Sequence, residues 1–227
     1  MNKTLGIFVV VVVIILGGFL LFRSGQDISP VDGGNAEVTG ETNGSAIDTP
    51  TPAADKVTHV LDQKQSSLTW YAERIVGASH TGTVHIKSGN LTSNASGFTG
   101  GAFVIDMTTI TESNSTQLFL THEKSNDFFG VEQFPESTFV ITSIESKGSG
   151  TYQVTGNLTI RDITNKISFP ATATGDGDVV SVSADFTIDR TEWDIIFDSG
   201  SIFKTLGDKA IKDDVEFSLE LVFTVAA

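Results

Sequence analysis

The chain has 227 residues, carries 28 acidic against 14 basic residues for a net charge of −14, and contains no cysteine. The lack of cysteine excludes disulfides, thiolate metal sites, a cysteine nucleophile and the lipid-modified cysteine of bacterial lipoproteins. A nucleic-acid partner is not expected, because contact with phosphates requires a basic face and this chain is acidic.

Residues 1–22 are predicted to form a transmembrane anchor. The run LGIFVVVVVIILGGFLLF, residues 5–22, has no charge, and as a helix it would be about 27 Å long at roughly 1.5 Å per residue, close to the thickness of a hydrocarbon core. A cleaved signal peptide is the alternative, but the run exceeds the usual apolar region of about 7 to 15 residues and no A-x-A-like site follows it. Lys3 and the amino terminus face only Arg23 across the run, so the positive-inside rule favours an extracytoplasmic domain, periplasmic or at the cell surface. Cleavage would instead give a secreted domain.

Residues 23–55 are predicted to be a disordered acidic linker. They carry six acids and one base among Gly, Thr, Ser and Pro, without an aromatic residue, a composition that cannot bury a core. A flexible chain of this length reaches roughly 30 Å, enough for a tethered domain to work at a bilayer surface.

Residues 56–227 are predicted to be one all-β domain. Apolar and polar residues alternate with period two, which is typical of strands with one buried face, in residues 68–72, 103–107, 154–160, 182–188 and 217–225. Turn-forming stretches are expected at 87–90, 93–97, 147–150 and 174–178. One helix is expected at about 116–130, stopped by Gly130. About eight antiparallel strands would then form either a sandwich or a closed barrel, and periodicity does not choose between them.

The side chains expected to point inward from these strands are large and apolar, and they would either line an internal tunnel or fill a core. The candidate lining residues are Trp70, Phe103, Ile105, Phe139, Ile141, Leu158, Ile160, Phe186, Ile188, Leu221 and Phe223.

The stretch DRTEWDIIFDSGS, residues 189–201, gathers enough charge to suggest an active site. Asp189, Glu192 and Asp194 are its candidate catalytic carboxylates. Paired-carboxylate chemistry requires two opposed groups about 5 to 9.5 Å apart with separated pKa values, and one outward-facing run does not provide this. We therefore predict a barrel rim in which Arg190 pairs with nearby acids.

The four histidines, His59, His80, His85 and His122, do not have metal-ligand spacing. His80 and His85 differ in strand parity, and His122 with Glu123 lacks the second histidine of an H-E-x-x-H motif. Neither a metal nor a cofactor is predicted.

Two motifs in the predicted domain are distinctive. They are H-x-x-S-x-D-F-F at 122–129, followed by Phe134-Pro135, and VTGNLTIR at 154–161. They lie within five segments, 66–91, 100–111, 121–144, 152–172 and 188–222, that together cover most of residues 57–225. In this order the segments resemble the YceI-like family of lipid- and polyisoprenoid-binding proteins.

This resemblance implies an extended, lipocalin-like antiparallel β-barrel whose apolar tunnel holds a long isoprenoid chain and which has no established chemistry. Many family members are periplasmic or secreted, whereas this chain starts with a long hydrophobic segment and a linker. His122 and Asp127 lie in the matched motif and are candidate contacts to a ligand head group at the tunnel mouth. The alternative for His122 is a hydrogen bond between the helix and the barrel.

The sequence therefore predicts a non-enzymatic, membrane-tethered barrel that binds one amphipathic lipid, an isoprenoid or polyprenyl quinone, for carriage, storage or sensing. An adhesive or assembly module with a filled core is the structural alternative. A lipid-modifying enzyme that uses Asp189, Glu192 or Asp194 is the weaker one. No oligomeric state is predicted.

Overall fold

The computed structural model describes residues 56–113, 117–176 and 178–226. The predicted anchor and linker, residues 1–22 and 23–55, lie outside the described residues. The strands are β1 (Val57–Leu61), β2 (Ser67–Glu73), β3 (Ser79–Thr83), β4 (His85–Asn94), β5 (Gly97–Asp106), β6 (Glu136–Gly148), β7 (Thr151–Ile160), β8 (Ile163–Asp176), β9 (Val179–Asp189) and β10 (Asp214–Val225). The helical segments are α1 (Gln117–Lys124) and the short 3-10 turns η1 (Met107–Thr109), η2 (Arg190–Trp193) and η3 (Gly207–Lys209).

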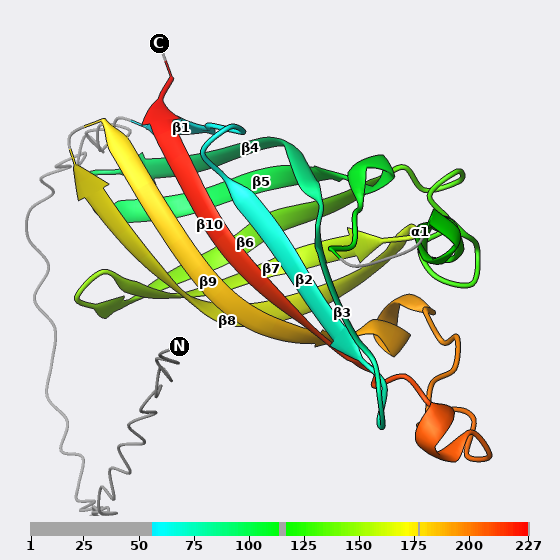
Figure 1. Cartoon of the computed structure of the whole chain (residues 1–227). Coiled ribbons are helices and arrows are strands. Elements are labelled where there is room, and N and C mark those ends of the chain that lie inside the picture. The colour runs from blue at the N-terminus through cyan, green and yellow to red at the C-terminus, as the bar shows by residue number, and fades with distance from the viewer. Residues whose placement is uncertain (1–55, 114–116, 177, 227) are drawn as a thin grey trace, which may run out of the picture. The chain divides into compact units, whose positions relative to one another are not determined.

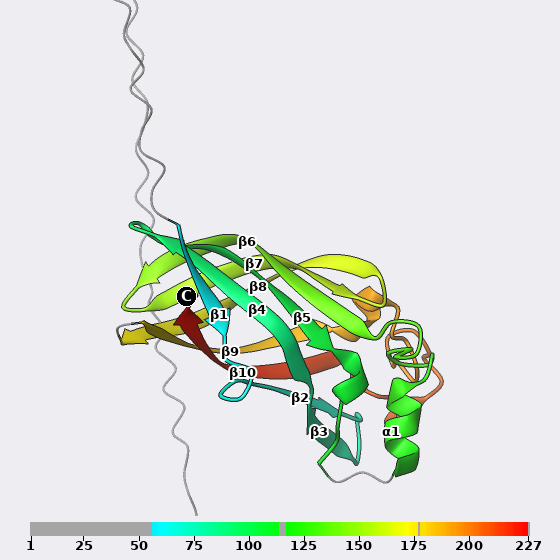
Figure 2. The same ribbon diagram turned by 90° about the horizontal axis from the view of Figure 1, so that it is seen from above.

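The ten strands form one antiparallel sheet that closes into a barrel (Figure 1; Figure 2). From β4 to β10 each strand pairs with the next along the chain. The free side of β10 pairs with β1 near its end and with β2 near its start, while β1 pairs with β4 and β2 with β3. β1 and β2 therefore occupy one strand position of the barrel, and β3 and β4 occupy the next, so the ten strands fill eight positions. The prediction of an all-β fold with about eight antiparallel strands is confirmed, and the closed barrel is the architecture adopted.

The predicted alternation places one face of each strand inside the barrel. In β10, Val215 and Phe223 are buried while Glu216 between them is exposed, and in β9 Ile188 is buried next to exposed Thr187. The phase holds because successive side chains of a strand point to opposite faces of the sheet.

The two ends of the barrel differ in their connections (Figure 1). Short hairpins join β4 to β5, β6 to β7 and β8 to β9 at one end. The opposite end carries the long β5–β6 connection with η1 and α1, and the β9–β10 connection with η2 and η3. We call this second end the long-loop end.

The turn expected at residues 87–90 is wrong, because these residues lie within β4. A register shift between Ile86 and Ser88 marks a β-bulge there. Gly89 is buried, and a Cβ on it would lie 2.6 Å from Cδ1 of Phe103. The glycine therefore makes room for an aromatic ring on the neighbouring strand. The other three expected turns are confirmed.

The helix expected at about 116–130 is shorter, because α1 ends at Lys124. The Ser125 hydroxyl donates a 2.6 Å hydrogen bond to the carbonyl of His122, and such a bond competes with helix continuation. The Gly130 amide donates to the Ser125 carbonyl, with a left-handed φ of 55° at Gly130. Within the described ranges no helix has the length and hydrophobicity needed to cross a bilayer.

Candidate functional site

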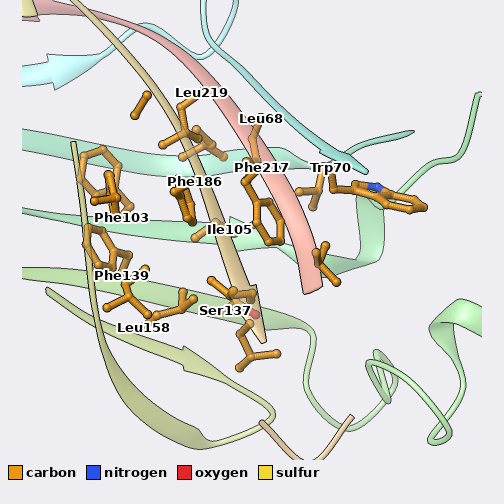
Figure 3. Close-up of a pocket in the computed structure, with 18 of the residues that line it drawn as sticks. Leu68, Trp70, Phe103, Ile105, Ser137, Phe139, Leu158, Phe186, Phe217 and Leu219 are labelled. Atoms are coloured by element: carbon orange, nitrogen blue, oxygen red, sulfur yellow. The ribbon is translucent and has the colours of Figure 1, made fainter. Parts of the chain in front are cut away.

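The barrel encloses a cavity of about 210 Å³. Residues from all eight strand positions of the barrel line it, and the turn after α1 contributes Phe128 and Phe129 at the long-loop end. Figure 3 shows aromatic and aliphatic side chains from opposite sides of the barrel that point toward a common interior. The cavity therefore suits an apolar occupant.

Aromatic rings form a row across this interior. Phe186 of β9 stacks on Phe169 of β8 with centroids 4.4 Å apart, and on Phe217 of β10 at 5.4 Å. The row continues from Phe169 to Phe139 at 5.6 Å and from Phe139 to Phe103 at 6.4 Å. Such ring pairs add stability beyond the area that they bury, so the wall is held in a defined shape.

All eleven candidate lining residues contact this cavity. They are Trp70, Phe103, Ile105, Phe139, Ile141, Leu158, Ile160, Phe186, Ile188, Leu221 and Phe223. The indole nitrogen of Trp70 donates to the Thr111 carbonyl at 3.2 Å, so its only polar atom is satisfied by protein. That these residues contact a ligand stays a prediction.

Four further lining residues, Glu123, Ser137, Tyr152 and Arg190, carry polar or charged groups. Arg190 is 4% exposed. Its Nε donates to the Lys212 carbonyl at 3.1 Å and its Nη1 to the Ile195 carbonyl at 2.6 Å, while Nη2 donates to Asp213 Oδ1 at 3.3 Å. The guanidinium thus ties the beginning of the β9–β10 connection to its end, just before β10.

Glu123 of α1 is only 6% exposed. Burial raises its pKa to about 8, the negative charge of Glu112 adds to this shift, and Lys124 opposes it. The carboxyl is therefore largely protonated at neutral pH. Its Oε2 has no hydrogen-bond partner among the described residues, and neither has Oγ of Ser137.

The stretch at 189–201 builds the rim of the barrel. The carboxylate of Asp189 accepts hydrogen bonds from the amide and the hydroxyl of Thr191 and so caps η2. Trp193 is fully buried and its indole donates to the Leu158 carbonyl at 3.1 Å, whereas Glu192 and Asp194 are exposed. Arg190 pairs with Asp213, which lies outside the stretch.

His122 and Asp127 bond to each other and are not among the residues that line the cavity. His122 Nε2 lies 3.1 Å from Asp127 Oδ2, and both side chains are exposed. The His122 ring packs edge-on against Phe128 and Phe197. Contact of this pair with a ligand head group stays a prediction.

The other histidines have separate surroundings. His59 contacts the Ser93 hydroxyl at 2.9 Å and His80 bonds to Glu112, while His85 is exposed at the start of β4. Among the described residues no group of three His, Asp or Glu side chains could hold a metal ion.

Sequence reasoning missed Glu123, Ser137 and Arg190 as lining residues. Ser137 lies two residues before Phe139, and Phe139 and Ile141 were predicted to point inward. Continuing this alternation by one step would have placed Ser137 on the inner face. Glu123 follows Leu120 by three residues and shares its face of α1, which was the available signal.

The chain belongs to the YceI-like domain family, whose pattern matches residues 59–223. Among curated relatives, a UPF0312 protein of Shewanella sp. strain ANA-3 is 28% identical over 127 residues, which is 55% of this chain and 66% of the relative. A UPF0312 protein of Pseudomonas putida strain W619 is 43% identical over 56 residues, 25% of this chain and 29% of that protein. The chain thus spans less than two thirds of these relatives' length.

Two solved structures share the fold. The crystal structure of Burkholderia cenocepacia BcnA has a TM-score of 0.59 at 19% identity, and the match covers 71% of this chain and 98% of BcnA. A polyisoprenoid-binding domain from Saccharophagus degradans, implicated in plant cell wall breakdown, has a TM-score of 0.55 at 10% identity and covers 74% and 98%. At these identities the likeness concerns the fold.

Proposed function

We propose that this barrel binds one amphipathic lipid with an isoprenoid-type chain inside its cavity, and that it acts by binding rather than by catalysis. The observation that carries this function is the internal cavity, whose lining consists mainly of apolar side chains. A filled core, which the adhesive-module alternative requires, would leave no such space. The fold likeness to a polyisoprenoid-binding domain supports the same function.

The size of the cavity sets a condition on binding. An engineered apolar cavity of about 150 Å³ in another protein holds benzene, so about 210 Å³ admits an apolar group of that order. A longer chain requires the lining rings to move apart, and Phe139, Phe186 and Phe217 are the half-buried members of the ring row.

The energetics suit reversible binding. Removal of a CH₂ group from water is worth about 0.8 kcal/mol, but a lipid in a bilayer has already left water. Transfer from membrane to cavity therefore has a small net free energy. This balance fits carriage, storage or sensing of a membrane lipid.

The proposal includes a tether that keeps the barrel beside a membrane, outside the cytoplasm. It rests on the apolar run at residues 5–22 and the acidic linker that follows. Alkaline carbonate extraction of cell membranes tests the tether: the full chain should stay in the pellet, and full release into the supernatant would argue for cleavage. Fusion of the barrel to a reporter that is active only outside the cytoplasm tests on which side of the membrane the barrel lies.

Native mass spectrometry of the full chain, purified from cells in mild detergent and followed by solvent extraction, tests the binding. A stoichiometric added mass that proves to be an isoprenoid or quinone lipid is the expected result. An apo mass that stays unchanged after incubation with a panel of isoprenoids would refute lipid binding and leave the interaction-module alternative.

A further inference from the structure

The apolar cavity has one polar end. Ser137 stands at the start of β6, opposite Ile105 near the end of β5, and Figure 3 shows its oxygen among carbon side chains. Glu123 belongs to α1 in the connection between these two strands, and the neighbouring Lys124 donates to the Thr108 carbonyl just after β5 at 2.7 Å. Both residues therefore line the cavity at the long-loop end.

Both residues carry a buried polar atom without a protein partner. Glu123 and Ser137 are 6% and 5% exposed, and Glu123 Oε2 and Ser137 Oγ make no hydrogen bond within the described part of the chain. Such atoms are rare in folded proteins, because the lost hydration is not repaid. An oxygen that a ligand brings to this end of the cavity would give such an atom a hydrogen-bond partner.

We propose that Glu123 and Ser137 form a hydrogen-bonding subsite for the neutral oxygen of a lipid head group, a carbonyl or a hydroxyl. This inference rests on the proposed lipid-binding function and defines its head group. A protonated carboxyl and a serine hydroxyl are both donors, so together they suit an oxygen that accepts two hydrogen bonds.

The charges around the subsite disfavour an anionic head group. Arg190, the one cation among the described lining residues, already donates to main-chain carbonyls and to Asp213. Glu112 adds negative charge beside Glu123, and Lys124 is turned toward Thr108. A phosphate would therefore enter this end without a free counter-charge.

The subsite also responds to pH. The groups that act on Glu123 are Glu112, itself bonded to His80 of β3, and Lys124 of α1. The pKa of Glu123 lies at about 8, so above that pH the carboxyl loses the proton that it would donate. Binding of a carbonyl head group should weaken as pH rises through this value.

The test uses three probes with the same branched carbon skeleton: phytone, a ketone; 2,6,10-trimethylpentadecane, its hydrocarbon counterpart; and the phosphate ester of the alcohol that corresponds to phytone. Uptake by the full chain from cyclodextrin is quantified by mass spectrometry at about pH 6 and at about pH 9.5, on either side of the Glu123 pKa. We expect phytone to bind about two- to tenfold more tightly than the hydrocarbon at the lower pH, the range of one net hydrogen bond. That preference should shrink at the higher pH, and the phosphate should bind most weakly.

Matched variants distinguish binding of the head group at the subsite from binding of the hydrocarbon part of the lipid in the cavity. Glu123→Leu and Ser137→Ala should each reduce the preference for phytone over the hydrocarbon, because each removes one of the two donors. Uptake of the hydrocarbon by each variant shows that the variant folds. Glu123→Gln keeps a donor that cannot ionise and should keep the preference at both pH values. Equal binding of phytone and the hydrocarbon by the wild type would overturn the subsite alone. Failure of both probes to bind would refute the lipid-binding function and the subsite with it.

Discussion

Glu123 is a buried carboxyl whose pKa lies far above the ordinary value of a glutamate. Its pKa in the folded barrel is about 8, against an ordinary value of 4.5, so between these values the folded protein holds a proton that the unfolded chain has released. Folding stability from this group is fully present below about pH 4.5 and is lost as pH rises to about 8, at about 1.4 kcal/mol per unit.

We therefore predict that the free energy of unfolding falls by a few kcal/mol between about pH 5 and about pH 8. Urea titrations across this range measure the fall. The Glu123→Leu variant should show a flatter pH profile and greater stability at pH 8, because it removes a buried carboxyl whose Oε2 lacks a partner. A wild-type profile as flat as that of the variant would contradict the raised pKa.

Gly89 is a second residue whose role depends on its neighbours. A Cβ on Gly89 would lie 2.6 Å from Phe103 Cδ1, and the ring is fixed by contacts with Phe139 and Phe223. We predict that Gly89→Ala destabilises the domain by about 1 to 3 kcal/mol, the usual cost of overpacking, measurable by thermal or urea unfolding. Gly100→Ala on β5, where the nearest atom is 3.6 Å away, is the control and should be nearly neutral.

Among the elements, the β9–β10 connection depends on one buried side chain. Arg190 bonds to carbonyls of Ile195, Ile211 and Lys212. Arg190→Lys should destabilise the domain by about 1 to 3 kcal/mol, because an ammonium cannot reproduce the planar fork and leaves buried carbonyls unpaired.

The matched control for this change is Arg74→Lys. Arg74 pairs with Asp198 at 3.6 Å, and both side chains are about one third exposed, so its substitution should alter stability by less than about 1 kcal/mol. Thermal unfolding compares the two variants. Equal losses would mean that the fork geometry of Arg190 contributes little.

The element scale also shows where sequence patterns fail. KSGN at 87–90 has turn-forming composition, yet it continues β4, where Gly89 pairs with Phe103 of the adjacent strand β5. The helix stops at Lys124 rather than near Gly130, because the hydroxyl of Ser125 bonds to a helical carbonyl. Both outcomes depend on a partner that composition does not name.

For the whole molecule, the width of the cavity should decide which chain it accepts. Phe186 stands in the row of rings between Phe169 and Phe217, and Phe186→Leu keeps the wall apolar while it removes the ring. We predict that the ratio of bound branched phytane to bound linear hexadecane rises in this variant, because a wider lumen accommodates methyl branches. Competitive uptake measured by mass spectrometry gives the ratio.

Thr187→Ala is the control for this change, because Thr187 is the next residue of β9 and points outward. Its ratio should equal that of the wild type. An unchanged ratio in Phe186→Leu would mean that the ring row does not select the chain, even where lipid binding itself persists.

The sequence by itself determined which residues of each strand face inward, because period-two alternation follows from strand geometry alone. All eleven candidate lining residues accordingly lie along one cavity. Only the tertiary structure decided that β10 meets β1 and β2 and so closes a barrel rather than a sandwich. It likewise decided that Glu123 and Ser137 lie unpartnered inside. The physical reason is that alternation fixes a side chain's face within its own strand, whereas closure and burial depend on segments distant in the chain.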